Sequence, residues 1–343
     1  MLVVVSNASS DEHDAGPGHP ERAERTRAAW DGLMTAGLHD AIVATRARPA
    51  TSHELHRVHA PAYLAFLEGV SAAGGGHLDP DTSMSKGSWS TALLAAGAGI
   101  EAVAALDRHA GDAALVLARP PGHHAGPEQA MGFCLLNNVA VTAAALVARG
   151  ERVAIVDWDV HHGNGTQEIF WDDPRVLFVS VHERGLFPGT GRGTEVGGPS
   201  ARGGTLNIPL PSGTAGDAVR LAFDELVEPT VSAFAPTWVL VSAGFDGHRA
   251  DPIGGWALTA GDYGDLAARV SSWVPERGRL VAFLEGGYDL VALGASVGSV
   301  GAAFLGEPYR AEAPSPGTTG MDEVAAMQDS WRRQAAAQVA VRP

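Results

Sequence analysis

The sequence predicts an α/β protein built on a doubly wound, mainly parallel β-sheet that is flanked by helices. Short runs rich in valine, isoleucine and leucine alternate with alanine-rich segments of helical character. Strands that are apolar on both faces are typical of parallel sheets covered by helices on both sides. Ionisable or aromatic side chains follow most of these runs, where open parallel sheets bind their ligands. The sequence therefore predicts an active site at the carboxyl ends of the strands.

The apolar runs are the expected strands of this sheet. They are residues 2–6, 113–118, 152–157, 175–181, 237–244 and 279–287. The alanine-rich segments are expected helices, at residues 89–108, 137–149, 217–234 and, last, about 321–340. The stretches at 71–88, 119–132 and 184–216 are expected long loops, which are usually functional in a compact domain. We expect a single domain over residues 1–343, with its motif-bearing core at about 10–305.

The composition limits the classes of protein to which the chain can belong. The chain has 343 residues, 45% hydrophobic and 18% charged, which is enough for a sizeable core. The net charge of −15 disfavours a nucleic acid partner, because phosphate binding needs clustered lysine and arginine. The single cysteine, Cys134, fits a reducing compartment. Neither a signal peptide nor an uncharged apolar stretch of about 18 residues is visible, so we expect a cytoplasmic protein without membrane contact.

The stretch DWDVHHGNG follows the apolar run at 152–157 and places carboxylates and imidazoles at its end. Burying such groups without partners costs several kcal/mol each, so a bound cation is expected. Asp159 and His161 are two residues apart and point to the same side of an extended segment. Asp246, from another strand end, completes a three-ligand set typical of catalytic zinc. Fe(II) and Co(II) remain open, because the set contains no cysteine.

Other polar groups at the strand ends supply acid–base chemistry. His123 and His124 form an adjacent imidazole pair that can act as general base. Asp157 and Asn164 flank the metal motif, and each could orient one histidine. Tyr288 lies in EGGY and could donate a hydrogen bond to an oxyanion. Together these groups predict metal-assisted hydrolysis of an amide.

An ordered set of motifs also resembles a known family. The motifs are RPPGHH, GFCLLNN, DWDVHHGNGTQ, FPGTG, SAGFD, DPIGG and EGGY. Together they resemble the zinc-dependent histone deacetylase superfamily, in its class II and bacterial histone deacetylase-like amidohydrolase branch. Acetylpolyamine amidohydrolases are relatives of that branch. The resemblance implies an arginase/deacetylase fold, one catalytic Zn²⁺ and a narrow substrate tunnel.

The resemblance implies the same roles that the residues suggest by themselves. His124 matches the general base, and His123 matches the histidine that assists it electrostatically. Asn164 stands where class I enzymes have aspartate, so His124 should be less basic. The metal ligands, the orienting carboxylate and the oxyanion donor correspond to Asp159, His161, Asp246, Asp157 and Tyr288.

The resemblance also implies how a substrate is held. Gly132, Phe133 and Phe187 match the tunnel walls, and Asp81 matches the rim aspartate that holds the substrate backbone. Ile253 occupies the place of the acidic gatekeeper in the polyamine-preferring vertebrate member, which weakens a polyamine interpretation.

Further positions match accessory sites of the family. Arg22 matches the arginine that lines the acetate-exit region. A structural K⁺ or Na⁺ ion is expected at Asp157, Asp159, His161, Ser180 and Val181, and a second near Phe170, Asp173 and Val176.

These observations leave more than one function open. The first hypothesis is a deacetylase of acetyl-lysine-type substrates, and the second is a deacylase of acetylpolyamines or other small molecules. A non-catalytic binding module is disfavoured by the intact set of ligands, histidines and tyrosine. An arginase-like two-metal enzyme is disfavoured because Gly163 and His248 stand where additional acidic ligands are needed. Related enzymes pair subunits through their mouth loops, so a homo-oligomer is compatible with the sequence.

Overall fold

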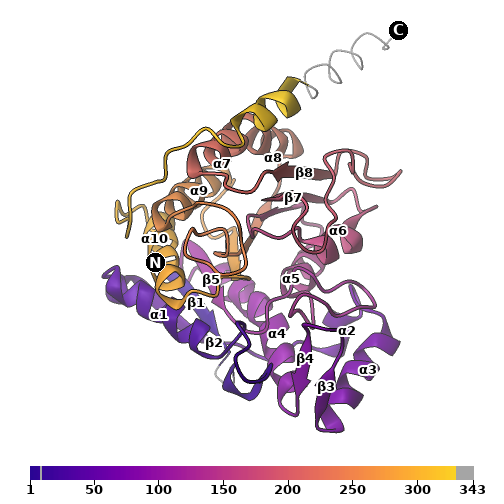
Figure 1. Ribbon diagram of the computed structural model, residues 1–343. Helices are drawn as coiled ribbons and strands as arrows, with labels where there is room; N and C mark the ends of the chain where they lie inside the picture. Colours follow the sequence, from indigo (N-terminus) through magenta and orange to yellow (C-terminus); the bar gives the residue numbers. More distant parts are fainter. Residues whose placement is uncertain (8–9, 330–343) are drawn as a thin grey trace.

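The fold is built on a large parallel sheet with helices on both faces. The computed structural model describes residues 1–7 and 10–329 (Figure 1). Within them, eight parallel strands form one sheet in the order β2-β1-β5-β10-β9-β6-β7-β8. The predicted fold class is confirmed. The strands are β1 (Leu2–Ser6), β2 (Ile42–Arg46), β5 (Ala113–Leu117), β6 (Val153–Asp157), β7 (Val176–Glu183), β8 (Thr205–Leu210), β9 (Trp238–Ala243) and β10 (Leu280–Leu284).

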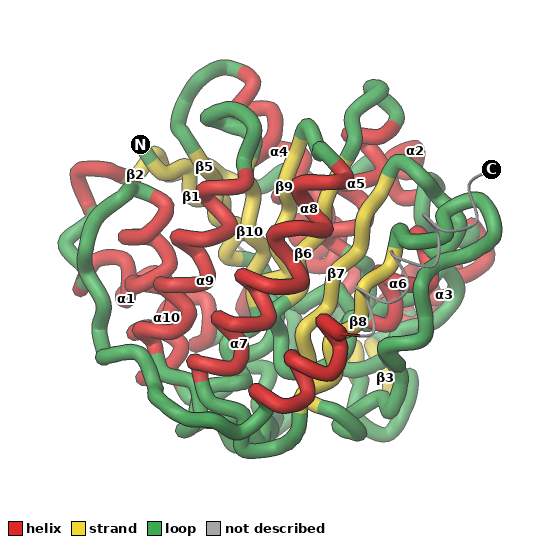
Figure 2. The backbone as a smooth tube through the Cα atoms, turned by 90° about the horizontal axis from the view of Figure 1, so that it is seen from above, coloured by secondary structure: helices red, strands yellow, loops and turns green. Residues whose placement is uncertain are grey.

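The helices form a layer on each face of this sheet, and Figure 2 shows the long loops gathered at one end of the strands. One layer consists of α1 (Glu24–Thr35), α7 (Gly216–Ala222), α8 (Glu228–Phe234), α9 (Ala260–Trp273) and α10 (Leu290–Phe304). The other layer consists of α3 (Pro61–Ala72), α4 (Ser88–Asp107) and α5 (Asn138–Val147), with the short helices α2 (Ser52–Leu55) and α6 (Asn164–Phe170) nearby.

The sheet has an apolar core on each face, which explains why the sequences of its strands are continuous hydrophobic runs. In β1, Leu2 and Val4 belong to one core while Val3 and Val5 belong to the other. Successive side chains of a strand point to opposite faces, so a strand covered on both faces needs apolar residues at every position. The same burial on both faces holds for β5, β6, β9 and β10.

Polar side chains cap the N-termini of α5 and α10. The Asn137 side chain accepts a hydrogen bond from the Ala140 N–H at the start of α5. The Asp289 side chain accepts one from the Ala292 N–H at the start of α10. Such caps satisfy amide groups that the first helical turn leaves without partners. Because Asp289 follows Tyr288 directly, the start of α10 fixes the end of the loop that carries the tyrosine.

The edges of the sheet differ from the expectation. Strand β8 lies inside the segment 184–216 that was predicted to be a loop, and it contains Pro209. An edge strand tolerates proline because one row of its amides needs no partner. Strand β2 forms the opposite edge and is half-exposed, so it lacks the apolar signal of the inner strands. A two-stranded hairpin, β3 (Gly75–His77) and β4 (Ser83–Ser85), occupies the predicted loop 71–88.

Two predicted helices also differ in detail. The helix expected at 217–234 contains a π-helical segment, Phe223–Val227, between α7 and α8. Of the last predicted helix, residues 321–329 are helical and residues 330–340 lie outside the described residues. Among the helices described, α4 is long and apolar enough to span a membrane by length and composition. However, 61% of its apolar window is buried in the protein, as expected for a core helix.

The central strands β5, β10, β9, β6 and β7 are neighbours in the sheet. These are the strands whose carboxyl ends carry the polar motifs of the sequence. Because the strands are parallel, their ends meet at one edge, and the sheet brings distant motifs together.

Close packing of α1 against α10 gives a stability prediction. A Cβ atom on Gly32 would overlap with the carbonyl group of Gly294 on the facing helix. Gly32→Ala should therefore lower the free energy of unfolding by about 1–3 kcal/mol through overpacking, measured by urea denaturation. Gly69→Ala is the matched control, because nothing lies within 4 Å of its Cβ position on α3. The control should stabilise by a few tenths to about 1 kcal/mol; an equal gain in both variants would contradict the packing argument.

Candidate active site

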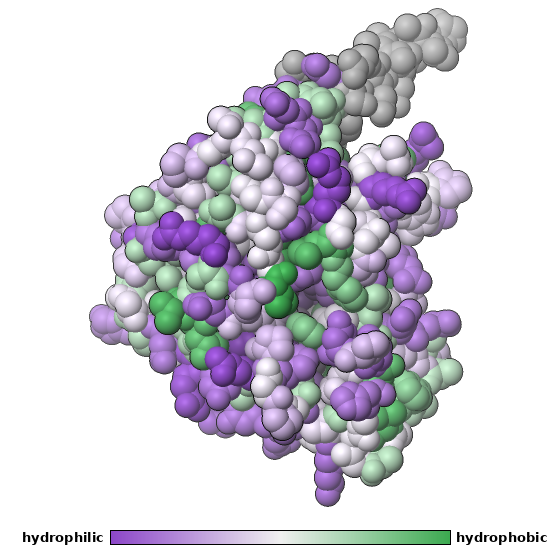
Figure 3. Space-filling view, in the orientation of Figure 1, coloured by the Kyte–Doolittle hydropathy of each residue, from purple (hydrophilic) through white to green (hydrophobic). Residues whose placement is uncertain are grey.

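A cavity of about 240 Å³ opens at the carboxyl edge of the sheet. In Figure 3, apolar side chains gather near the middle of the face shown, among hydrophilic neighbours. The cavity lining combines ionisable groups with apolar walls, as ligand sites commonly do. The lining residues are Asp81, Pro121, His123, His124, Gly132, Phe133, His161, Leu186, Phe187, Asp246, Ile253, Gly286 and Tyr288.

Asp159, His161 and Asp246 form a compact ligand group. Their ligand atoms lie within 4.8 Å of one another, and all three residues are buried. His161 Nδ1 is 3.1 Å from Asp159 Oδ1 and 3.1 Å from Asp246 Oδ2. The sheet produces this geometry, because β6 leads to the first two residues and its neighbour β9 leads to the third.

The electrostatics of this group fit a bound cation. Burial and the nearby charge of Asp159 both raise the pKa of Asp246. Burial acts to lower the pKa of His161, but Asp246 and Asp159 raise it to about 10. The site thus favours positive charge at the nitrogen that faces both carboxylates. A divalent ion with nitrogen and oxygen ligands satisfies that demand.

The two histidines next to the ligand group have opposite protonation tendencies. His123 Nδ1 lies 2.9 Å from Asp157 Oδ2, and His124 Nδ1 donates to Asn164 Oδ1 at 2.8 Å. Burial disfavours the charged form of His123, but Asp157 and Asp159 raise its pKa well above the usual value. Burial, followed by the charges of His123 and His161, lowers the pKa of His124 well below the usual value. His124 is therefore neutral, with Nε2 as its free acceptor.

Tyr288 lines the same cavity as the two histidines. Its backbone N–H donates to Asp251 Oδ2 at 2.6 Å, which holds the loop after β10. The guanidinium carbon of Arg25 lies 4.7 Å from the centre of the tyrosine ring. Burial raises the pKa of the Tyr288 hydroxyl well above its usual value, so the group stays a hydrogen-bond donor.

Aromatic rings narrow the cavity beside the histidine pair. The rings of Phe187 and His124 are 5.1 Å apart, and those of Phe133 and Tyr288 are 5.7 Å apart. Gly132 must lack a side chain, because a Cβ atom there would overlap with the ring of His124. The proposed wall residues thus surround one passage.

Hydrogen bonds connect the mouth of the cavity to its aromatic wall. Asp81, in the turn between β3 and β4, lines the cavity together with Ile253. The Thr82 hydroxyl donates to Asp81 Oδ1 at 3.1 Å and accepts from the Phe133 N–H at 3.1 Å. Thr82 therefore links the rim carboxylate to a wall residue.

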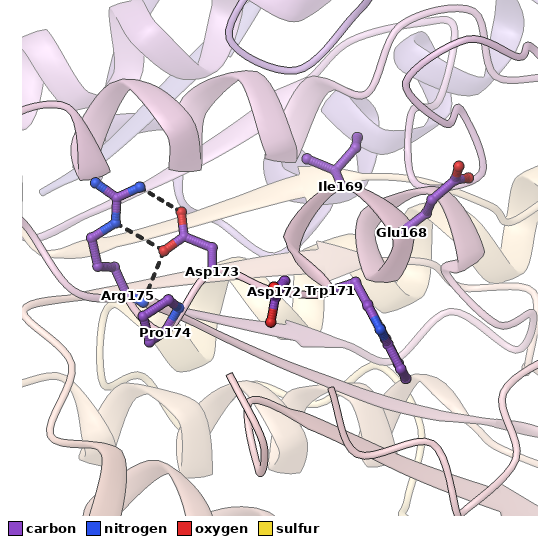
Figure 4. Close-up of a pocket in the computed structure, with 7 residues that line it drawn as sticks. All are labelled: Glu168, Ile169, Trp171, Asp172, Asp173, Pro174 and Arg175. Atoms are coloured by element: carbon purple, nitrogen blue, oxygen red, sulfur yellow. Dashed lines mark hydrogen bonds and ion pairs between the residues drawn. The ribbon is translucent and has the colours of Figure 1, made fainter. Parts of the chain in front are cut away.

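The residues predicted to hold monovalent cations fall in two places. Asp157 and Ser180 are register partners at the ends of β6 and β7, with Val181 following. The second expected site lies near a surface pocket of about 490 Å³ at the end of α6 (Figure 4). There the carboxylate of Asp173 is paired with Arg175, as the dashed lines show.

The assignment of Arg22 to a buried acetate-exit region is wrong. Arg22 is exposed, whereas Arg25 is fully buried and donates through Nε to the Gly287 carbonyl at 2.6 Å. Arg25 also forms an ion pair with Glu21, and Glu21 forms a second ion pair with Arg119. The apolar spacing of α1 contains a signal for this, because its buried positions are Arg25, Ala29, Gly32 and Leu33.

The two positions considered for additional metal ligands, Gly163 and His248, supply no acidic side chain. Among the described residues, Asp159, His161 and Asp246 are the one group of three potential ligands. A Cβ atom on Gly163 would overlap with the carboxylate of Asp157. His248 pairs with Glu312 at 2.8 Å instead of facing the site.

The fold and site define an α/β protein with a buried metal-type ligand group beside a histidine pair. Residues 19–304 match the model of the histone deacetylase domain. The chain is 43% identical over 292 residues to a probable deacetylase of Archaeoglobus fulgidus, covering 84% of this chain and 81% of that protein. It is 40% identical over 280 residues to a histone deacetylase-like amidohydrolase of Pseudomonas aeruginosa, covering 80% of this chain and 74% of that protein.

Solved structures agree with the sequence comparison. The crystal structure of the HDA15 HD domain superposes with a TM-score of 0.87 at 34% identity, covering 99% of both chains. The chain therefore belongs to the histone deacetylase family, which confirms the family predicted from the motifs. Membership of this family indicates a hydrolase.

The charge on His161 gives a pH prediction for the metal-free protein. Its pKa of about 10 lies above the ordinary value of 6.5, so the folded state binds this proton more tightly than the unfolded state. The resulting stabilisation is complete below about pH 6.5 and is lost as the pH rises towards 10. Urea unfolding from pH 6 to 10 should show this loss without metal. Zinc-loaded protein should show a smaller loss, and equal slopes would contradict the assignment of His161.

Proposed function

We propose that the protein is a zinc-dependent deacetylase that hydrolyses the amide of N-acetylated amines, with acetyl-lysine-type side chains as its substrate class. One observation carries the proposal. The neutral base His124 lies beside the Asp159, His161 and Asp246 group, and Tyr288 lines the same cavity. The aromatic walls leave a passage suited to an alkyl chain. The proposal includes a cytoplasmic location, which is supported by the single, buried Cys134.

Asp159, His161 and Asp246 would hold the zinc ion. The bound metal supplies Lewis acidity, which lowers the pKa of a coordinated water and polarises an acyl oxygen. A structural K⁺ or Na⁺ ion near Asp157 and Ser180 is part of the proposal. It is supported by the adjacent positions of these residues on β6 and β7.

The residues of the chain then divide the proton transfers among them. His124 Nε2 takes a proton from water as the oxygen attacks the acyl carbon. The Tyr288 hydroxyl donates a hydrogen bond to the oxygen that gains negative charge. The C–N bond breaks as His124 returns its proton to the nitrogen, so acetate and a free amine leave. His123, held charged by Asp157, favours the neutral state of His124 before the attack.

The role of Tyr288 has a direct test. Tyr288→Phe should keep its zinc content and lose about 10²–10³ in kcat, because one oxyanion donor is removed. Steady-state kinetics on an acetyl-lysine peptide and metal analysis provide the two measurements. Tyr309→Phe, which lies outside the cavity, is the control and should leave kcat unchanged. Normal turnover by Tyr288→Phe would remove the tyrosine from the mechanism.

Acetylated polyamines are the second candidate substrates. The mouth carries Asp81, whose backbone N–H donates to Asp79 Oδ1 at 3.0 Å, so a second carboxylate lies close to it. Such a pair could bind an ammonium group of a small substrate. Ile253 lines the cavity without contributing charge, which favours the peptide.

The two substrate classes are separated by one assay. The zinc-loaded enzyme should show at least about 10²-fold higher kcat/KM on an acetyl-lysine peptide than on acetylated polyamines, about 2.7 kcal/mol of discrimination. A chelator should abolish both activities. The reverse preference would assign the enzyme to small molecules, and a zinc-loaded protein without turnover of any acetylated amine would contradict the proposed function.

A further inference from the structure

Glu285 is a buried carboxylate that the proposed mechanism does not use. It follows β10 directly, is 0% exposed and lies three residues before Tyr288. A carboxylate in such a place needs several hydrogen-bond donors, because burial without them costs several kcal/mol. The identity of its donors therefore indicates what the residue does.

Two of the donors to Glu285 come from the histidine loop, the segment between β5 and α5 that carries His123 and His124. Its Oε2 atom accepts the Gly122 N–H at 2.6 Å and the His123 N–H at 3.1 Å. Its Oε1 atom accepts the Ser242 hydroxyl at 3.3 Å, on neighbouring strand β9. One side chain thus connects the histidine loop to the strand that leads to Asp246.

The histidine loop needs this acceptor because the sheet no longer supplies one. Strand β5 ends at Leu117, and the following Pro120 and Pro121 have no amide hydrogen. The next two amides, of Gly122 and His123, are buried beyond the end of the strand. A buried amide without a partner is costly, so an acceptor from β10 determines the path of the loop.

The contacts of Glu285 complete the restraint on His123. The His123 carbonyl accepts the Thr166 N–H at 3.2 Å, and its ring is held by Asp157. The N–H of His123 is the remaining polar group of its backbone, and Glu285 is its partner. These three contacts together fix the backbone N–H, the backbone carbonyl and the ring of His123. Because the rings of His123 and His124 are 4.0 Å apart, a shift of one displaces the other.

We infer that Glu285 is a positioning residue for the reaction proposed above. By accepting two adjacent backbone N–H groups, it sets the histidine loop so that His124 reaches the attacking water. The inference rests on the proposed function and adds to it a residue that does not line the cavity and whose side chain bonds to Gly122, His123 and Ser242. The function of Glu285 is geometric, so an uncharged acceptor of the same length can replace it. Burial raises the pKa of Glu285 to about 7, so a neutral side chain suits this environment.

Two conservative variants separate geometry from charge. Glu285→Gln keeps an oxygen at the same reach and can donate to Ser242, but it lacks the charge. Glu285→Asp keeps the charge, but its carboxylate is withdrawn by one methylene group. If positioning is the role, zinc-loaded Glu285→Gln should retain kcat within about threefold. Glu285→Asp and Glu285→Ala should lose about 10- to 100-fold in kcat with little change in KM and zinc content, as expected for small displacements of reacting groups.

A matched control removes another buried carboxylate that accepts backbone N–H groups. Asp262 is 1% exposed and accepts the N–H groups of Thr259 and Ser315, outside the cavity. Asp262→Asn should lower the melting temperature and leave kcat unchanged. Wild-type kcat in Glu285→Ala would overturn the inference. So would a normal Glu285→Asp combined with an inactive Glu285→Gln, because charge would then be the role.

A measurement independent of turnover keeps the inference separate from the proposed function. Side-chain NMR of zinc-loaded protein reports the Nδ1–H signals of His123 and His124. These signals should persist in Glu285→Gln and shift or broaden in Glu285→Asp. Unchanged signals in Glu285→Asp would overturn the inference. If wild-type protein hydrolyses no acetylated amine, the proposed function fails, and this NMR comparison still decides the role of Glu285.

Discussion

Burial of carboxylates at the carboxyl edge of the sheet is the constraint on which the rest of the site depends. Asp157, Asp159 and Asp246 are each 0% exposed, and backbone N–H groups converge on them. Gly244 and Gly286 pass so close to these carboxylates that a Cβ atom at either position would overlap with them. The loops therefore fold around negative charge, and small residues occur where the backbone must approach it.

The same charge distribution separates two neighbouring imidazoles chemically. His123 faces Asp157 and Asp159, which favour its charged form. His124 faces an amide oxygen and two histidines, and burial also favours its neutral form. Environments that push the pKa values of adjacent groups apart are typical of acid–base catalysis. The expected weaker basicity of His124 thus has burial as its largest cause, while the Asn164 hydrogen bond acts in the opposite direction.

Much of the fold and the core of the site could be predicted from local pattern. The inner strands are apolar at every position, so β5, β6, β9 and β10 could be recognised without a structure. The edge strands β2 and β8 could not, because half-exposed and proline-containing strands lack that signal. The ligand set could be predicted from the sequence, because Asp159 and His161 lie on the same side of one segment. Arg25 was missed because a motif match alone does not show which face of a helix is buried.

The sequence by itself determined the residue types, their order and their placement after strands. These features are sufficient to predict the family and the residues of the ligand group. Tertiary structure decided which distant groups meet, because sheet order is set by packing across the whole chain. Only the adjacency of β10 with β5 brings Glu285 to the amides of Gly122 and His123. Likewise, the burial that raises or lowers each pKa belongs to the packed protein. Desolvation depends on all the surrounding atoms, and no single motif contains it.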